Sequence, residues 1–327
     1  MKVAFTYNIQ KNDIPEEAEF DTPETIELVN KELQGLGHTV KLIDVKKDVT
    51  EIIRDLKEFS PDIIFNTAEG QNGRFREAFC PALFDNLEIP FAGSDAYTCT
   101  VTLDKSVTKL MLHKNGIRTP NWIFVQKMKD IEKFPLRFPV IIKPNFEGSS
   151  RGISLKNIHE NLTEMKDHLE KFLQQFPEGI IIEEFVDGVD LTVPYLQAAF
   201  PETHGVLPAC LYTFEQHEQG NYKIYDFKLK QYLSSQVIVN IAEDLSPEII
   251  KEIQKTSLKT YEILNVKDIG RIDYRLSKDG KLYFIEINAL PCLQEGASIY
   301  ISASSYGLSV KDVIQKILES AQKRYGI

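Results

Sequence analysis

The stretch from Gly270 to Asn288, GRIDYRLSKDGKLYFIEIN, constrains the fold more than any other part of the sequence. Two alternating runs flank Asp279-Gly280, a dipeptide that favours a tight two-residue hairpin turn. Counting back from that turn pairs strand residues whose side chains share one face, because side chains alternate along a strand. The predicted pairs are Asp273 with Glu286 and Arg271 with Asn288, and the opposite face carries Ile272, Tyr274, Ile285 and Ile287.

Two carboxylates placed opposite each other on a sheet repel, at a cost of roughly 0.2–1 kcal/mol. A cation between Asp273 and Glu286 removes that repulsion. Hard divalent metals take carboxylate and amide oxygens, so these two residues and Asn288 predict a magnesium site of the kind that also holds phosphates. The alternative interpretation is the solvated polar face of an ordinary hairpin.

Length and composition indicate a globular enzyme-sized chain. Its 327 residues are enough for two or three domains, and 43% of them are hydrophobic and 26% charged. The net charge of −10 argues against nucleic acid as the main partner. The four cysteines form no CxxC pair, and no apolar run approaches the roughly 18 residues that span a bilayer. We therefore expect a soluble, cytoplasmic protein with reduced thiols and no membrane partner.

Residues 1–100 alternate strands and helices, which predicts a parallel, doubly wound α/β sheet. Ligands of such sheets lie beyond the carboxyl ends of the strands. Asn66, Glu69 and Gly70 follow a buried strand, DIIFN, and are either ligand-binding residues or turn residues. The patterns GxGxxG, after the first strand, and GxxxxGK[ST] are both absent, which argues against a dinucleotide or P-loop site in this domain.

Residues 101–185 begin with a predicted helix that Asp104 caps and Gly116 ends. Two strands follow, and a small-residue loop, NFEGSSRGISL, then connects two apolar strands in the manner of a hairpin. Its Gly and Ser residues let backbone amides approach an anion, and Lys143 can add a point charge. The alternative is a flexible turn.

The strand IIIEEFV and the following DGVDLTV resemble a hinge between two lobes. Glu183 or Glu184 could accept from an amino group and Asp190 could bind sugar hydroxyls, unless they are only surface acids. After two more strands, the segment HEQGNYKIYDFKLKQYLSS is predicted to be a loop. A helix over 247–264, the hairpin and a last helix from Ser309 complete the chain.

Four motifs resemble, in order and spacing, those of the ATP-grasp superfamily, in particular its D-alanine–D-alanine ligase branch. They are KPNFEGSSRGIS, IIIEEFVDGVDLTV, YDFKLKQ and GRIDYRL with YFIEINALP, and the resemblance also includes FNTAEG and LDKSVTK. It implies an ATP-grasp fold with an N-terminal Rossmann-like domain (1–100), a central lobe (101–185) and a C-terminal lobe (186–327) with the metal hairpin. The two lobes would clamp ATP.

The resemblance also implies roles for individual residues. Lys105 and Lys143 would bind phosphates, the loop Glu147–Ser150 would close over them, and Lys230 would reach the γ-phosphate. Glu183 would face the adenine amino group, the backbone of Phe185 or Val186 would bind the purine edge, and Asp190 would hold the ribose. Asp273, Glu286 and Asn288 would coordinate two magnesium ions. Arg271 would stabilise the tetrahedral intermediate or bind a substrate carboxylate, and the catalytic set would be Arg271, Ser149 and Lys230.

The implied reaction joins two amino acids. ATP phosphorylates one carboxylate, and the amine of the second substrate attacks the acyl phosphate. The protein supplies positive charge and alignment, and a closing loop excludes water. The same branch implies a possible homodimer. The alternatives are a related ligase of a biosynthetic pathway with a different acid or amine, an ATP-binding regulator without turnover, and an NAD-dependent enzyme, against which the missing glycine pattern argues.

The substrate half departs from the family pattern. Cys292 follows Pro291 where the family has glycine, and LQEGASIY replaces the serine-rich segment that grips the second substrate, leaving Ser298 as the candidate beside an unexpected Glu295. In the N-terminal segment Glu19, Asp21 or Glu24 could hold an ammonium group. Gln231 or Tyr232 takes the place of the family's loop tyrosine. The predicted substrate residues are therefore Glu24, Glu69, Tyr232, Cys292 and Ser298.

Overall fold

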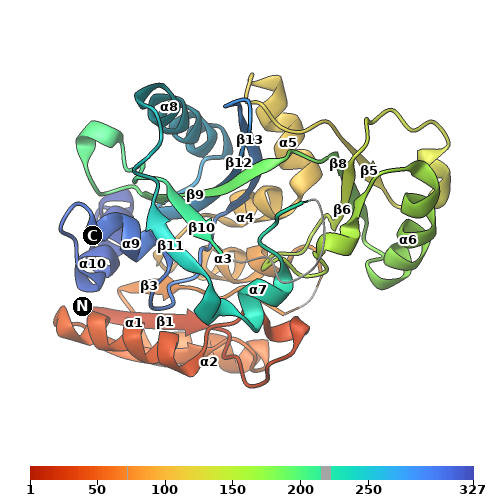
Figure 1. Cartoon of the computed structure of the whole chain (residues 1–327). Helices are drawn as coiled ribbons and strands as arrows, with labels where there is room; N and C mark the ends of the chain where they lie inside the picture. Colours follow the sequence, from red (N-terminus) through yellow and green to blue (C-terminus); the bar gives the residue numbers. More distant parts are fainter. Residues whose placement is uncertain (72, 215–221) are drawn as a thin grey trace.

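The computed structural model describes residues 1–71, 73–214 and 222–327, which form three sheets (Figure 1). The first has the order β2-β1-β3-β4, and all its strands are parallel, as predicted. Its strands are β1 (Lys2–Tyr7), β2 (Thr39–Asp44), β3 (Ile63–Asn66) and β4 (Phe91–Ala92). Its helices are α1 (Pro23–Gly35), α2 (Val49–Phe59) and α3 (Arg76–Asn86).

The sequence signals at α1 explain where this helix begins. The Thr22 hydroxyl accepts a hydrogen bond from the Thr25 N–H, and Pro23 occupies the first turn, where a missing N–H costs nothing. Ile26, Val29 and Leu33 recur at helical spacing and are buried against the sheet. The long segment before α1, which includes a 3-10 turn at Pro15–Glu17, is therefore held at one end by a capped helix.

The second sheet is antiparallel, in the order β5-β8-β6-β7. Its elements are β5 (Trp122–Val125), β6 (Val140–Pro144), β7 (Ile158–His159), β8 (Ile180–Glu184) and α6 (Leu162–Gln175), with 3-10 turns at Met128–Ile131 and Leu155–Asn157. The small-residue loop does lead from β6 to an antiparallel neighbour. The predicted second strand at residues 153–155 is wrong, however, because Ser154 bonds to Asn157 in a turn and pairing starts only at Ile158.

The third sheet has the order β11-β10-β9-β12-β13. Its strands are β9 (Gly188–Leu196), β10 (Cys210–Thr213), β11 (Ile238–Ile241), β12 (Ile269–Ser277) and β13 (Leu282–Asn288), and α8 (Pro247–Leu264) packs on it. Helix α5 (Lys105–Lys114) begins at Asp104 as predicted. The sequence did not predict β11, α4 (Ala96–Leu103), α9 (Ser298–Ser304) or α7 (Phe227–Gln231), which lies in the predicted loop; residues 215–221 lie outside the described residues. Further 3-10 turns are Pro201–Thr203 and Ser234–Gln236.

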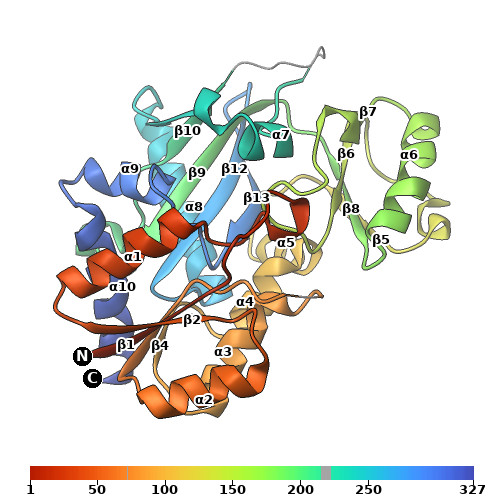
Figure 2. The same ribbon diagram turned by 90° about the horizontal axis from the view of Figure 1, so that it is seen from below.

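The last helix, α10 (Val310–Tyr325), returns to the first sheet and lies beside α1, so that the two termini are close together (Figure 2). The buried Asp268 fixes this return, because its carboxylate accepts from Arg324 Nη2 (2.6 Å) and from the Gly93 N–H (2.8 Å). In the described ranges no helix is both long and apolar enough to cross a bilayer. The division of the chain at residues 100 and 185 stays a prediction.

The hairpin of β12 and β13 has the predicted pairing at the site but not the predicted turn. Asp273 lies opposite Glu286, and Arg271 lies opposite Asn288, as expected. The Ser277 N–H, however, donates to Lys281 O (3.0 Å), so the loop has three residues, 278–280, with Gly280 at φ 77°.

A β-bulge restores the register between the turn and the site. Beyond the turn Tyr274 pairs with Phe284, and the register shifts before Asp273, which leaves Ile285 as the extra residue. The prediction that Ile285 faces the core is therefore wrong: it lines a cavity next to Glu286. The three-residue turn and the bulge shift the register in opposite directions, so Asp273 still pairs with Glu286.

Candidate active site

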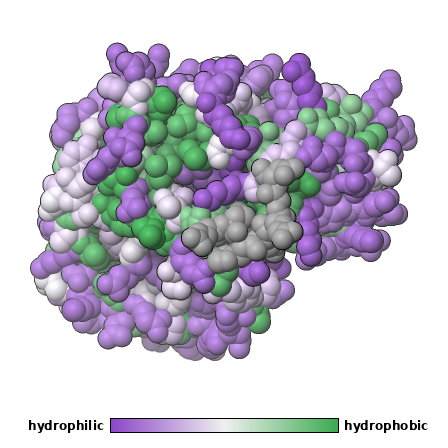
Figure 3. Space-filling view, viewed as in Figure 1, coloured by the Kyte–Doolittle hydropathy of each residue, from purple (hydrophilic) through white to green (hydrophobic). Residues whose placement is uncertain are grey.

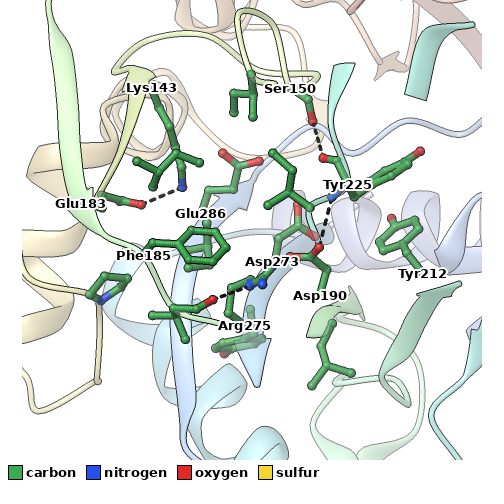
Figure 4. Close-up of a pocket in the computed structure, with 18 of the residues that line it drawn as sticks. Lys143, Ser150, Glu183, Phe185, Asp190, Tyr212, Tyr225, Asp273, Arg275 and Glu286 are labelled. Carbon is green, nitrogen blue, oxygen red and sulfur yellow. Dashed lines mark hydrogen bonds and ion pairs between the residues drawn. The ribbon is translucent and has the colours of Figure 1, made fainter. Parts of the chain in front are cut away.

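A cleft, here called the nucleotide cavity, lies between the second and third sheets (Figure 4), and the space within it, open solvent included, is about 1000 Å³. Its walls come from β6, β8, the hinge after β8, β10 and the hairpin. Among the predicted ATP-binding residues it is lined by Lys143, Ser150, Glu183, Phe185, Val186, Asp190 and Lys230. An apolar part suited to a purine ring is formed by Ile141, Ile153, Leu191, Ile224 and Ile285.

The hinge backbone distinguishes between the two predicted donors. The Phe185 N–H already donates to Pro139 O (2.9 Å). The Val186 N–H donates to no acceptor among the residues that the structure describes, while Val186 O accepts from Arg275 Nε (3.0 Å). Val186 is therefore the better candidate for a hydrogen bond to the purine edge.

A buried triad of charges stands at the wall of the nucleotide cavity. The Glu183 carboxylate lies 2.7 Å from Lys143 Nζ and 2.8 Å from Lys109 Nζ, and Glu183 is 1% exposed. Burial alone would raise the pKa of Glu183, but the two ammonium groups lower it to about 2. Burial lowers the pKa of Lys109 to about 8. The charge of the ionised Glu183 carboxylate is thus already balanced by two lysines of the protein, whereas the prediction has this carboxylate facing the adenine amino group.

Arg275 ties the hinge to the hairpin. Its guanidinium donates to Asp190 Oδ1 (2.9 Å), Gly188 O (3.0 Å) and Lys223 O (3.2 Å), and it lies over the Phe185 ring. The predicted ribose residue Asp190 faces the cavity with this partner. Sequence reasoning missed both Arg275 and Lys109, although Arg275 is two residues beyond Asp273 on one strand face and Lys109 is one helical turn beyond Lys105.

The predicted phosphate loop contacts the segment that carries Lys230. Ser149 and Ser150 adopt φ 49° and 56°, in the left-handed region that non-glycine residues rarely occupy. Lys230 Nζ donates to Ser149 Oγ (3.1 Å), Ser150 Oγ donates to Tyr225 O (3.5 Å), and Lys105 Nζ donates to Glu147 O (2.5 Å). The two segments therefore meet over the phosphate end of the cavity.

Glu19 and Arg76 connect this loop to the first sheet. The Gly148 N–H donates to Glu19 Oε1 (2.7 Å), and the Arg76 guanidinium binds the same carboxylate through Nε and Nη2 (both 3.0 Å). Arg76 Nη1 also donates to Phe146 O (2.8 Å). Glu19, one of the three acids predicted to hold an ammonium group, is therefore fully engaged by the protein.

The metal-ligand candidates converge on the hairpin. Arg271 makes a bidentate contact with Asp273 (3.0 and 2.7 Å), which also accepts from Thr192 Oγ1 (2.7 Å) and Asn288 Nδ2 (3.3 Å). Glu286 has Lys105 Nζ at 3.4 Å. In the described part of the chain no three His, Cys, Asp or Glu residues gather as a metal site, and a metal held by Asp273 and Glu286 would have the Asn288 amide as a third donor. Two carboxylates and an amide are the hard oxygen donors that fit magnesium.

A second cavity of about 1680 Å³, here called the substrate cavity, adjoins the first. Lys230, Arg271 and Glu286 line both. Of the predicted residues, Glu24, Glu69, Lys105, Ser149, Asn288 and Cys292 line the substrate cavity, and so does Glu77, which the sequence analysis did not single out. A phosphoryl group that passes from one cavity to the other must cross this shared wall of cations and metal-ligand candidates.

Two of the five predicted substrate residues, and the alternative acid Asp21, line neither cavity. Tyr232 is 54% exposed and lines neither cavity, because α7 turns it outward. Ser298 is buried in the first turn of α9 and Glu295 is exposed before that helix, and neither lines either cavity. Asp21 is buried and accepts from Thr67 Oγ1 (2.5 Å). In this structure Tyr232 and Ser298 therefore lie outside both cavities, and the Gln231 side chain lies outside the described part of the structure.

A cavity between two antiparallel lobes, with Lys143 on one lobe and Lys230 on the other, is the arrangement of the ATP-grasp class of ATP-dependent ligases. A family model described as "D-ala D-ala ligase C-terminus" matches residues 111–319. A D-alanine–D-alanine ligase of Aquifex aeolicus is 32% identical over 291 residues, which cover 89% of this chain and 92% of that one. The chain belongs to the D-alanine–D-alanine ligase family, and it is an ATP-dependent ligase that forms a carbon–nitrogen bond.

Solved structures agree on the fold. The D-alanine–D-alanine ligase of Bacillus anthracis complexed with ATP matches with a TM-score of 0.78 at 22% identity and covers 100% of this chain and 99% of that one. The VanG D-Ala:D-Ser ligase of Enterococcus faecalis matches with a TM-score of 0.74 at 16% identity and covers 98% and 99%. At these identities the likeness confirms the predicted ATP-grasp fold and carries no information on substrates.

Proposed function

We propose that this ligase activates the carboxylate of one amino acid as an acyl phosphate and joins it to the amine of a second amino acid, as in D-alanyl-D-alanine synthesis. The wall shared by the two cavities carries this proposal. Lys230 and Arg271 place positive charge where the phosphoryl group is transferred, and Glu286 faces both reactants. Charge fixed in advance at this point stabilises the transition state without reorganisation.

Magnesium fits the donors at the same wall. Asp273, Glu286 and Asn288 would hold the ions, which when bound neutralise phosphate charge and polarise the transferred group. Burial alone would raise the pKa of Glu286, but Lys105, Lys143 and Arg271 lower it, so the carboxylate is kept ionised for a cation. Two ions are proposed because two carboxylates and an amide serve the phosphates of one nucleotide.

The remaining residues position the reactants. Lys143, held by Glu183, and Lys105 would bind phosphate oxygens, and the segments of Ser149, Ser150 and Lys230 would exclude water from the acyl phosphate. Val186 would read the purine and Asp190 the ribose. Arg271 would bind the developing oxyanion of the tetrahedral intermediate. In this arrangement the protein aligns the two substrates and stabilises the transition state, and the amine of the second substrate forms the carbon–nitrogen bond.

A different amine or acid is the second candidate, because the predicted Ser298 does not line the substrate cavity and Cys292, where the family has glycine, does. The VanG protein of Enterococcus faecalis, which has the same fold, is a D-Ala:D-Ser ligase, so the second substrate differs among ligases of this fold. An ATP-binding regulator without turnover is disfavoured, because Lys105, Lys143 and the metal-ligand candidates are all present.

Incubation with ATP, Mg²⁺ and a panel of D- and L-amino acids tests the proposal. Phosphate release together with a dipeptide mass for D-alanine alone would establish D-alanyl-D-alanine synthesis. A mass with another pair would establish the related ligase. Nucleotide binding without phosphate release from any amino acid would rule out the ligase.

We also propose a homodimer in the cytoplasm. Hydrophobic side chains gather over β9, β10 and β11 on one face (Figure 3), and Ile238 in β11 is 58% exposed. The four cysteines are unpaired, as in reducing compartments. Light scattering of the protein and of Ile238→Lys tests the dimer, which the variant should dissociate if this face is the interface.

A further inference from the structure

Two acidic side chains in the substrate cavity have no partner. Glu69 follows β3 and Glu77 lies in the first turn of α3, and both line the cavity. Neither makes a hydrogen bond or an ion pair with any residue in the described ranges, and each is half-buried where it meets the cavity. Burial raises the pKa of Glu69 well above its usual range, and the neighbouring charge of Glu77 adds to this effect.

The other nearby acids are already used. Glu19 is held by Arg76 and the Gly148 N–H, and Asp21 is buried with Thr67. Glu24 lines the same cavity but is exposed to solvent at the start of α1, where water screens its charge. Among the described residues, Glu69 and Glu77 are therefore half-buried carboxylates of this cavity that a ligand can still engage.

The charges of the substrate cavity are also divided between its walls. Lys105, Lys230 and Arg271 line the part that adjoins the nucleotide cavity, where a carboxylate is activated. Glu69 and Glu77 come from the first sheet and its helix α3. A substrate with a carboxylate and a cationic group at its two ends matches this division, because each end then meets opposite charge.

We propose that Glu69 and Glu77 bind an alkylammonium group of the amino acid whose carboxylate is activated; this rests on the proposed ligase function. The group is either the α-ammonium of an ordinary amino acid or the side-chain ammonium of a basic one. The positive charge of this ammonium group pairs with two carboxylates that have no ion-pair partner among the described residues. This pairing accounts for the presence of both carboxylates in the cavity. The N-terminal acids Glu19 and Asp21 are then structural.

Hydroxylamine trapping identifies the activated acid without knowledge of the second substrate, because hydroxylamine displaces phosphate from an acyl phosphate and yields a hydroxamate. The probes are D- and L-alanine, D- and L-ornithine, and lactate and propionate, which lack an ammonium group. Hydroxamate from the amino acids but not from lactate or propionate is expected. If alanine is the better substrate, the two glutamates bind the α-ammonium group. If ornithine is the better substrate, they bind the side-chain ammonium group.

Glu69→Gln and Glu77→Gln should raise the KM for the activated amino acid by about 10- to 100-fold, the range for a hydrogen bond to a charged group. The KM for ATP should stay within about twofold. Without substrate both variants should be more stable, with Tm raised by roughly 2–4 °C, because each removes an unpaired buried carboxylate. Glu27→Gln, on the exposed side of α1, is the matched control and should change neither quantity.

Several outcomes would overturn the inference: efficient hydroxamate formation from lactate, an unchanged KM in both variants, or a raised KM in Glu24→Gln but not in these. A lowered Tm in both variants would show a structural role instead. If no acid gives hydroxamate, the ligase proposal fails, and the stabilisation of the protein by alanine or ornithine still tests the binding site. Stabilisation that Glu77→Gln abolishes supports it, and the absence of stabilisation by either amino acid overturns it.

Discussion

The nucleotide and substrate cavities share a wall but satisfy their charges differently. In the nucleotide cavity the buried Glu183 and the half-buried Asp190 have ion-pair partners supplied by the protein. In the substrate cavity Glu69 and Glu77 have none among the described residues. The first cavity is thus preorganised before any ligand enters, whereas the second leaves charge for its ligand to neutralise. A ligase needs a preorganised nucleotide cavity for every reaction, whereas the charges of its substrate cavity differ with the substrate.

Removing a metal-ligand candidate from the shared wall should have the largest effect. Glu286→Gln keeps the side-chain volume and removes a negative charge that faces both cavities. We expect ATP-dependent hydroxamate formation to fall by roughly 10³-fold, because charge stabilisation of the transferred phosphoryl group is lost. The melting temperature should change little, since Glu286 is at the cavity surface.

Glu295→Gln is the control for this substitution, because Glu295 is exposed and lines neither cavity. It should retain full activity. Unchanged activity in Glu286→Gln would refute the metal assignment and would remove the main distinction between the shared wall and the rest of the substrate cavity.

Breaking the buried triad of the nucleotide cavity should mainly affect stability. Lys109→Met leaves Glu183 with one ammonium partner inside the protein, and breaking a buried pair typically costs about 3–5 kcal/mol. Urea unfolding should show this loss, and Lys114→Met, exposed near the end of the same helix, should not. Adding Glu183→Leu to Lys109→Met should recover part of the stability, because the uncompensated charge is removed. If Lys109→Met is as stable as the unsubstituted protein, the proposal that this buried triad preorganises the nucleotide cavity is contradicted.

The same contrast explains what the sequence could predict. The nucleotide cavity is built from short contiguous motifs, so Lys143, Ser150 and Val186 could be assigned from order and spacing. The pairing of Asp273 with Glu286 could be predicted from strand alternation, but only because the three-residue turn and the bulge at Ile285 cancel. Lys109 and Arg275 could have been predicted from the same periodicities, because one lies a helical turn beyond Lys105 and the other two strand positions beyond Asp273.

The substrate cavity could not be predicted in the same way. Its walls come from the loop before α1, the loop after β3, α3 and the segment after β13, and their approach depends on tertiary packing. Glu77 looked like any acid in the first turn of a helix. Tyr232 and Ser298 were assigned by sequence register, but α7 and the first turn of α9 direct these side chains away from the cavity.

The buried acid below the substrate cavity should make stability depend on pH. Burial raises the pKa of Asp21 to about 7. The folded state therefore holds a proton that the unfolded state has already lost between about pH 4 and 7, so stability falls as pH rises through this window. We expect Asp21→Asn to stabilise the protein at pH 8 by roughly 1–3 kcal/mol and to have little effect at pH 4. Urea unfolding at the two pH values measures the difference.

Glu69 and Glu77 contribute in the same direction, so Asp21→Asn should reduce the pH dependence without removing it. Asp55→Asn is a suitable comparison, because Lys41 lowers the pKa of Asp55 and the sign is opposite. Equal effects of Asp21→Asn at both pH values would show that Asp21 is ionised throughout, and the contrast in charge satisfaction between the cavities would then be smaller.

The smallest effect is expected at Cys292, where the substrate cavity departs from the family pattern. Its Sγ accepts from the Gln294 N–H (3.4 Å), and serine can accept the same bond, so Cys292→Ser should change kcat and both KM values by less than about threefold. Burial raises the pKa of the thiol, which should therefore react slowly with iodoacetamide at pH 7 although it is exposed to the cavity. The other three cysteines are buried, so the modification is selective. Complete alkylation should raise the KM for the activated amino acid and leave ATP binding unchanged, because Cys292 lines only the substrate cavity; loss of ATP binding would show that the two cavities do not act as separate sites.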